Sequence, residues 1–194
     1  MTSSAKKKVI AAREKKNKPL NHISLEMETS THFPVLIHLV QKVLSVEFPC
    51  LPILEMGSGL FSTPLLHWLC YERKRKLITC ESYKHYLDFA NKFKTLWHEI
   101  RFVKDWNKEK FEDKMFGVVF IDHSPKKPRT RADDALRFKD SADFIILHDA
   151  GSDSHEKYGY HKIYREFKYR YDWMGCLPHT TVLSNRHDLS DIHV

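Results

Sequence analysis

A glycine turn directly after a short apolar run is the feature that most constrains the fold of this chain. The run Pro52-Ile-Leu-Glu-Met56 leads into Gly57-Ser-Gly59, and an amphipathic segment follows at once. Glycines at such a turn let a ligand approach the backbone closely, because they carry no side chain. A second apolar run, Leu77-Ile-Thr-Cys-Glu81, ends in an acid. This layout predicts a nucleoside-binding βαβ unit in which the acid accepts hydrogen bonds from both ribose hydroxyls.

The spacing of the glycines disfavours two of the three cofactor classes that use this layout. A P-loop needs a lysine after its last glycine, and no lysine follows Gly59. A dinucleotide site prefers a third glycine where this chain has Ser62. The remaining pattern, Glu-x-Gly-x-Gly with Glu81 downstream, resembles the S-adenosylmethionine site of the class I methyltransferases. A glycine turn in some other α/β domain is the alternative.

The order of elements predicts an α/β fold: a doubly wound, mostly parallel seven-stranded sheet with helices on both faces and a C-terminal antiparallel hairpin. Continuously apolar strands that alternate with helices indicate a parallel sheet covered on both sides. This topology also resembles the class I methyltransferases, over about residues 30–185. Helices are expected at Phe33–Val46, Ser62–Tyr71, Tyr86–Trp97, Arg131–Phe138 and His161–Tyr169. Strands are expected at Ile53–Met56, Lys76–Glu81, Ile100–Val103, Phe116–Asp122, Asp143–Asp149, Asp172–Cys176 and Thr180–Ser184.

The length and the charge of the chain limit its possible domain organisation and partners. We expect residues 1–20 to be a disordered basic tail and residues 21–194 to form one domain. The net charge of +7 comes largely from that tail, so it is weak evidence for a nucleic-acid partner. No apolar run is long enough to span a membrane. The four cysteines have no Cys-x-x-Cys spacing, which favours reduced thiols, a cytoplasmic location (the host cytoplasm for a viral protein) and no zinc site.

The resemblance implies a set of cofactor contacts at the ends of the first three strands. The family places an acid near the cofactor's amino group, small polar residues on its carboxylate, and an acid with its neighbours on the ribose and adenine. Asp105 follows the third strand, where the family often places an acid on the adenine amine, and Trp106 is either a cofactor contact or core. The expected residues are Glu55, Gly57, Ser58, Gly59, Ser62, Thr63, Glu81, Ser82, Tyr83, Asp105 and Trp106.

The most distinctive local sequence, Ile121-Asp-His-Ser-Pro125, stands where methyl transfer needs its acceptor and base. Amine methyltransferases often carry Asn/Asp-Pro-Pro-aromatic at this strand end, so the sequence argues against that branch. We expect Asp122, His123 and Asp149 to be catalytic, with His123 as the candidate base. The alternative is that His123 only hydrogen-bonds the loop. His148 is expected to pack away from the site or to support it.

A divalent metal is possible and is not predicted. Metal-dependent O-methyltransferases hold magnesium with acids after the fourth and fifth strands, and Asp122 and Asp149 match two of those positions. The third position is Ala150, which offers no ligand atom, and nothing supports Asp153 in its place. The alternative is metal-free catalysis by His123, oriented by Asp122 or Asp149.

Residues after the fourth and fifth strands are candidates for contact with the acceptor. Arg131 closes a basic loop, 126–131, that would suit an anionic group, although most such runs are simply solvated. Tyr158 and Tyr160 end a polar segment that reads as an acceptor-side loop. They would stack on a sugar or ring, or else pack at the base of the loop.

Taken together, the motifs resemble small sugar O-methyltransferase domains of bacteria and large DNA viruses. The leading hypothesis is therefore an S-adenosylmethionine-dependent O-methyltransferase that acts on a sugar hydroxyl in a glycan. The alternatives are an RNA methyltransferase, a non-catalytic S-adenosylmethionine-binding subunit, and a nucleotide-sugar or dinucleotide binder. The oligomeric state is not predicted.

Overall fold

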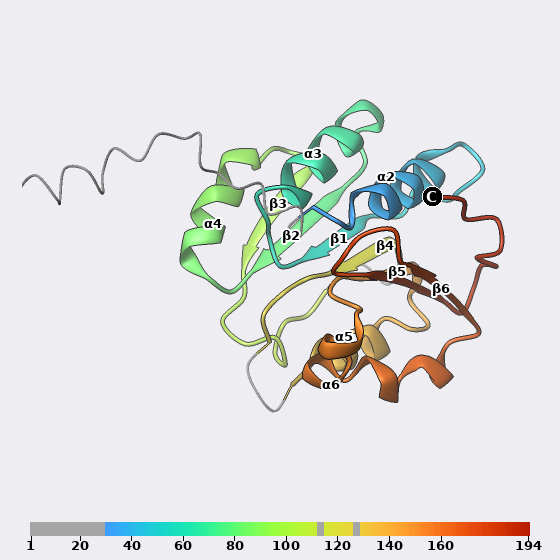
Figure 1. The fold of residues 1–194 in the computed structure, drawn as a ribbon. Helices are drawn as coiled ribbons and strands as arrows, with labels where there is room; N and C mark the ends of the chain where they lie inside the picture. The colour runs from blue at the N-terminus through green and yellow to red at the C-terminus, as the bar shows by residue number, and fades with distance from the viewer. Residues whose placement is uncertain (1–29, 112–114, 126–128) are drawn as a thin grey trace, which may run out of the picture.

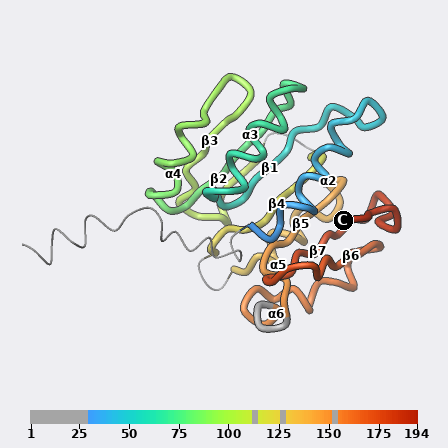
Figure 2. Tube along the Cα trace, turned by 45° about the horizontal axis from the view of Figure 1, so that its top comes forward, coloured from blue at the N-terminus to red at the C-terminus, as the bar shows by residue number. Residues whose placement is uncertain are grey.

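A seven-stranded sheet organises the chain, and its strand order is β3-β2-β1-β4-β5-β7-β6. The computed structural model describes residues 30–111, 115–125 and 129–194, with backbone only at 152–154, so the expected basic tail lies outside the described residues. Strands β1 to β5 pair in parallel, whereas β7 runs antiparallel to both β5 and β6 (Figures 1 and 2). The predicted fold class is therefore confirmed. The strands are β1 Ile53–Met56, β2 Leu77–Glu81, β3 His98–Phe102, β4 Phe116–Ile121, β5 Ala142–Leu147, β6 Tyr169–Trp173 and β7 Thr180–Ser184.

Helices cover both faces of this sheet (Figure 1). Helices α2 and α3 pack together on one face, α4 lies against β2 and β3, and α5 and α6 lie on the opposite face. The α-helices are α2 Phe33–Leu44, α3 Ser62–Arg73, α4 Lys84–Ala90, α5 Arg131–Arg137 and α6 Ser152–Tyr158. Short 3-10 helices occupy Asn91–Phe93, Tyr160–Lys162 and Tyr164–Glu166.

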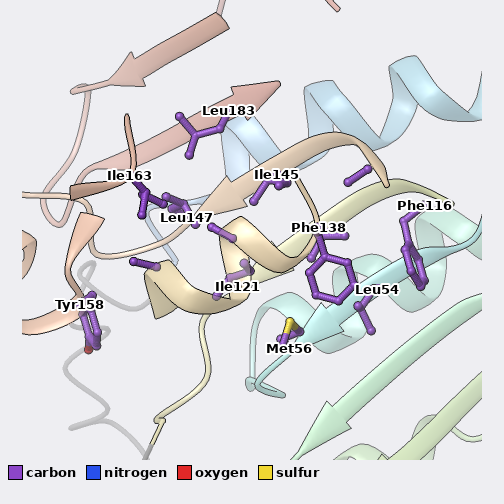
Figure 3. Packing of buried hydrophobic residues seen from close by; sticks show 14 of the residues in the cluster. Leu54, Met56, Phe116, Ile121, Phe138, Ile145, Leu147, Tyr158, Ile163 and Leu183 are labelled. Carbon is purple, nitrogen blue, oxygen red and sulfur yellow. The ribbon is translucent and has the colours of Figure 1, made fainter. Parts of the chain in front are cut away.

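Two hydrophobic layers follow from the alternation of side chains along the buried strands. In β1, Leu54 joins the layer on the α5 face, which Figure 3 shows with Phe116 and Phe138. Its neighbour Ile53 joins the layer beneath α2 and α3. Strands buried on both faces are continuously apolar for this reason, and that is why their positions could be predicted closely.

Two predicted helices are wrong. The helix expected at Tyr86–Trp97 is α4 followed by one 3-10 turn, because the Thr95 hydroxyl accepts a hydrogen bond from the His98 N–H and turns the chain into β3. The helix expected at His161–Tyr169 is replaced by two 3-10 turns and the start of β6, and the α-helix of this region, α6, lies before it at Ser152–Tyr158. Gly159 has a left-handed φ of 74°, which ends α6 and breaks the helical path.

A further element differs from expectation. Strand β6 ends at Trp173, three residues before the predicted end at Cys176, because the turn at Gly175 packs against the Trp173 ring. Helix α2 begins without a side-chain cap, because His32 is its N-cap residue and makes no cap bond. Within the described parts of the chain, no helix combines the length and apolarity that crossing a membrane requires.

Candidate functional site

A cavity of about 570 Å³ opens at the carboxyl ends of β1, β2, β4 and β5. This is where open α/β sheets bind ligands, beside the point where the strand order reverses. The glycine turn forms one part of the wall, Glu81 and Tyr83 a second, and the ends of β4 and β5 a third. His32 and Pro178, which no motif marked, complete the wall.

The glycine turn packs directly against the end of β4. Gly57 has a φ of 94°, and a Cβ built on it would lie 2.6 Å from both the Cα and the N of His123. Only glycine fits this position, because both the conformation and the space exclude a side chain. The close approach at Gly57 is therefore to the backbone of His123, whereas the predicted approach was that of a ligand, and it joins the glycine turn to the end of β4.

Glu81 lies at the floor of the cavity with its carboxylate held in place. Its Oε2 accepts hydrogen bonds from the N–H and the hydroxyl of Ser58, at 2.8 and 3.0 Å. Its Oε1 accepts from the backbone N–H groups of Ser82 and Tyr83, at 2.6 and 2.7 Å. The Ser58 hydroxyl is the one rotatable donor among these four, so a ligand hydroxyl can take its place on the carboxylate.

Glu55 and Thr63 support the glycine turn from below and do not form the cavity wall. The Thr63 hydroxyl lies 3.0 Å from a Glu55 oxygen and also accepts from the Gly59 N–H. The Thr79 hydroxyl donates to Glu55 at 2.7 Å. Burial raises the pKa of Glu55 to about 7, although these hydroxyls oppose the rise. A direct contact between Glu55 and the cofactor's amino group is therefore not supported.

The pKa of Glu55 in the folded state lies above its ordinary value of 4.5, so Glu55 should lower the free energy of unfolding as the pH rises. The folded state keeps the proton longer than the unfolded chain, so its contribution is complete below about pH 4.5 and is lost as pH rises to about 7. Between these two pH values the wild type should lose about 3 kcal/mol of unfolding free energy that the Glu55→Gln variant does not lose. Urea unfolding of both proteins across this range measures the difference. Parallel stability curves would show that Glu55 is ionised throughout.

Asp105 and Trp106 do not line the cavity. A cofactor contact was predicted for Asp105, whereas Trp106 was expected to be either a cofactor contact or core. The Asp105 carboxylate is bound by Asn107, through both its N–H and its side-chain amide. The Trp106 ring is buried and stacks on the His123 ring, with centroids 4.2 Å apart. Trp106 is thus core, and it supports the wall from behind.

His123 is held by an acid that the sequence did not indicate. Its Nε2 lies 2.8 Å from Oδ2 of Asp134, which also accepts from Arg129. The predicted orienting acids, Asp122 and Asp149, make no hydrogen bond with it in the described structure. Because the Asp134 carboxylate accepts the Nε2 proton, Nδ1 is the unprotonated nitrogen, and it has no partner among the described residues. Burial lowers the pKa of His123, although Asp134 opposes the change.

Arg131 does not bind a substrate as predicted, because its five guanidinium hydrogens are already used. It donates to the carbonyl oxygens of Asp122, His123 and His148. Its remaining hydrogens meet Oδ1 of Asp122 at 2.9 Å and Oδ2 of Asp149 at 3.1 Å. Its side chain is 4% exposed. Arg131 therefore fastens the ends of β4 and β5 together from behind the cavity.

Tyr158 and Tyr160 support Arg131 and do not line the cavity, which agrees with the alternative that they pack at the base of the loop. The Tyr158 ring lies 4.0 Å from the Arg131 guanidinium carbon, a cation–π contact. The Tyr160 hydroxyl donates to the carbonyl oxygen of His148 at 3.0 Å. Part of the basic loop expected beside them, 126–128, lies outside the described residues.

His148 contacts both acids, which agrees with the second of the two roles expected for it, packing away from the site or supporting it. Its Nδ1 lies 3.2 Å from Oδ1 of Asp122 and 3.4 Å from Oδ1 of Asp149. Its Nε2 lies 3.1 Å from the hydroxyl of Thr31. One nitrogen of His148 and one oxygen from each acid lie within 4.8 Å of one another, which is the arrangement that a divalent ion could use. Asp149 itself has a left-handed φ of 55°, which turns its carboxylate toward Arg131.

No protein-family model matches this chain, and no curated protein matches its sequence. Solved structures match by fold. The human methyltransferase 10 domain containing protein aligns with a TM-score of 0.54 and 13% identity, covering 79% of this chain and 83% of that one. The N-terminal domain of human METTL16 in complex with SAH has a TM-score of 0.53 and 10% identity, covering 78% and 69%. The hMettl16 catalytic domain in complex with the MAT2A 3'UTR hairpin 1 gives the same values. This chain therefore has a methyltransferase fold.

Proposed function

We propose that the chain is an S-adenosylmethionine-dependent methyltransferase. The observation that carries this proposal is the Glu81 carboxylate, which lies at the cavity floor against the glycine turn. A carboxylate at the end of β2 beside such a turn is suited to bind the two hydroxyls of a ribose. The methyltransferase fold of the chain, and a neighbour of the same fold with SAH bound, give independent support.

The residues around Glu81 form two groups, one for each end of such a ligand. Tyr83 and Tyr86, both about half exposed, flank the nucleoside end and offer ring faces to an adenine. Gly57, Gly59 and Ser62 line the opposite end, beside the start of α3. We assign the methionine part of the cofactor to this end, where the glycine turn leaves room beside Ser62. The cofactor would supply a methyl group on a positively charged sulfur.

The acceptor would lie at the ends of β4 and β5. The carboxylates of Asp122 and Asp149 are each about a quarter exposed there, so they can accept hydrogen bonds from an O–H or N–H group. The His123 ring is fully buried, so its Nδ1, although it has no partner among the described residues, is not open to an acceptor in this structure. The proton of the acceptor would move to one of the two carboxylates as the carbon–sulfur bond breaks.

RNA is the acceptor class to test first. One structural neighbour is bound to an RNA hairpin. The carboxylates at the acceptor end of the cavity could accept a hydrogen bond from either an O–H or an N–H group. A sugar hydroxyl is the second candidate, because the Asp122-His-Ser-Pro125 sequence lacks the Asn-Pro-Pro-aromatic pattern of amine methyltransferases. Sugar specificity has no support from the structural neighbours.

Incubation with methyl-labelled S-adenosylmethionine and either total RNA or an extracted glycan fraction tests this function. Transfer to RNA that falls steeply as salt rises would identify an RNA enzyme, because phosphate contacts are released by salt. Transfer to glycan that is insensitive to salt would identify a sugar enzyme. Binding of the cofactor without transfer to either would favour the non-catalytic subunit.

A further inference from the structure

The acid pair formed by Asp122 and Asp149 raises the question of what balances its charge. Two carboxylates at adjacent strand ends repel each other unless a cation lies close to both. A divalent metal ion is one solution, and the neighbouring nitrogen of His148 would complete a set of three ligands. The surrounding hydrogen bonds indicate a different solution.

The first counter-charge is Arg131, which contacts both carboxylates at once. Its hydrogen bonds to Asp122 and Asp149, at 2.9 and 3.1 Å, are reinforced by three backbone carbonyl oxygens and by the Tyr158 ring. A guanidinium with all five hydrogens bonded and its face covered cannot move away without losing these contacts together. It therefore stays between the acids whatever binds in the cavity.

The second counter-charge is His148, and its protonation follows from its partners. The Thr31 hydroxyl lies 2.9 Å from the carbonyl oxygen of Pro178, which can only accept, so Thr31 donates its single hydrogen there. The Thr31 oxygen must then accept from Nε2 of His148. At the other side of the ring, Nδ1 faces two carboxylate oxygens, which also accept. Both ring nitrogens therefore carry hydrogen, and the imidazole is a cation.

The local pKa values agree with this geometry. Burial lowers the pKa of His148. The hydrogen bond to Asp122 and the charges of both acids together raise it by more than burial lowers it, so the pKa of His148 lies above its ordinary value. Burial would raise the pKa of Asp122, but the hydrogen bond from His148 and the charges of His148 and Arg131 lower it to about 2.

We propose that Arg131 and the imidazolium of His148 are the built-in counter-charges of the Asp122–Asp149 pair, so that this site works without a divalent metal ion. Two negative and two positive charges balance, and a metal ion would have to displace the Nδ1 proton and lie beside a fixed guanidinium. Arg131 and His148 are positioning residues here, because they hold the carboxylates whose free lone pairs face the cavity. The role of these carboxylates toward an acceptor rests on the proposed function, but their charge balance does not.

Titration with Mn²⁺, read from the electron paramagnetic resonance signal of the free ion, tests the proposal directly. The full chain is titrated with saturating S-adenosylhomocysteine, beside Asp149→Asn as the matched variant. We expect wild type and variant to take up Mn²⁺ equally, within about twofold, because any weak uptake occurs elsewhere. Uptake by the wild type that Asp149→Asn lowers by tenfold or more would overturn the proposal.

Two further measurements distinguish this proposal from a site that fails to bind Mn²⁺ for some other reason. Nitrogen-15 NMR at neutral pH should show His148 with both ring nitrogens protonated, and an unprotonated Nδ1 would contradict the proposal. Arg131→Gln should gain Mn²⁺ uptake at least tenfold over wild type if it folds, and Asp149→Asn in that background should remove the gain. Calorimetry with S-adenosylhomocysteine on the same samples tests the proposed function separately, since its failure would leave the Mn²⁺ and NMR results intact.

Discussion

Arg131→Met is expected to lower the free energy of unfolding by about 3–5 kcal/mol, as the loss of one partner from a buried ion pair typically does. The substitution leaves Asp122 and Asp149 facing each other without their shared cation. It also leaves three backbone carbonyl oxygens at the ends of β4 and β5 without a donor. Urea unfolding followed by circular dichroism measures the change.

Arg170→Met is the matched control for this experiment. Arg170 also forms an ion pair, with Asp172 at 2.8 Å, but both side chains are 37% exposed. A surface pair of this kind contributes at most about 1 kcal/mol, because water screens the charges. Equal losses in the two variants would mean that Arg131 does not hold the strand ends together.

Gly57→Ala is expected to lower the free energy of unfolding by about 3 kcal/mol or more, and to remove cofactor binding in whatever folded protein remains. The new Cβ would lie 2.6 Å from backbone atoms of His123, and backbone cannot yield as a flexible side chain can. The positive φ of 94° adds strain for any residue that has a Cβ. Thermal unfolding and calorimetry with S-adenosylhomocysteine measure the two effects.

Gly151→Ala controls for the general cost of replacing a glycine near the site. A Cβ on Gly151 meets no atom of the described residues within 4 Å, and its φ is −70°, which any residue adopts. Because Gly151 is the N-cap residue of α6, where alanine is less favourable than glycine, we expect a loss of at most about 1 kcal/mol. A Gly57→Ala protein as stable as Gly151→Ala would show that the glycine turn is not packed against β4 as described.

The sheet and its order of elements could be predicted because strands buried on both faces leave a continuous apolar signal. Helices beyond β5 could not be placed, since a single left-handed residue, Gly159, decides where α6 ends. The periodicity of the sequence does not show which glycine adopts that conformation. The 3-10 turns after it follow from local packing for the same reason.

Residues at strand ends could be predicted to line the cavity, whereas the contacts that hold them could not. Residues such as Gly57 and Glu81 sit at strand ends, and strand ends of a parallel sheet meet at one edge. The acceptor half depends on contacts between distant segments, such as Thr31 with His148 and His123 with Asp134. Nothing in the spacing of Asp134, in α5, or of Thr31, just before α2, marks either residue as a partner of these histidines, so the sequence did not predict the two contacts.

Calorimetry with S-adenosylhomocysteine on wild type, Glu81→Ala and Asp105→Ala tests the central claim most directly. The wild type should bind, and Glu81→Ala should bind at least about tenfold more weakly, because charged hydrogen bonds to two hydroxyls are lost. Asp105→Ala should bind within about threefold of wild type, since Asp105 does not line the cavity. A folded wild type that binds neither S-adenosylhomocysteine nor S-adenosylmethionine would contradict the methyltransferase proposal, and so would binding that is unchanged by Glu81→Ala.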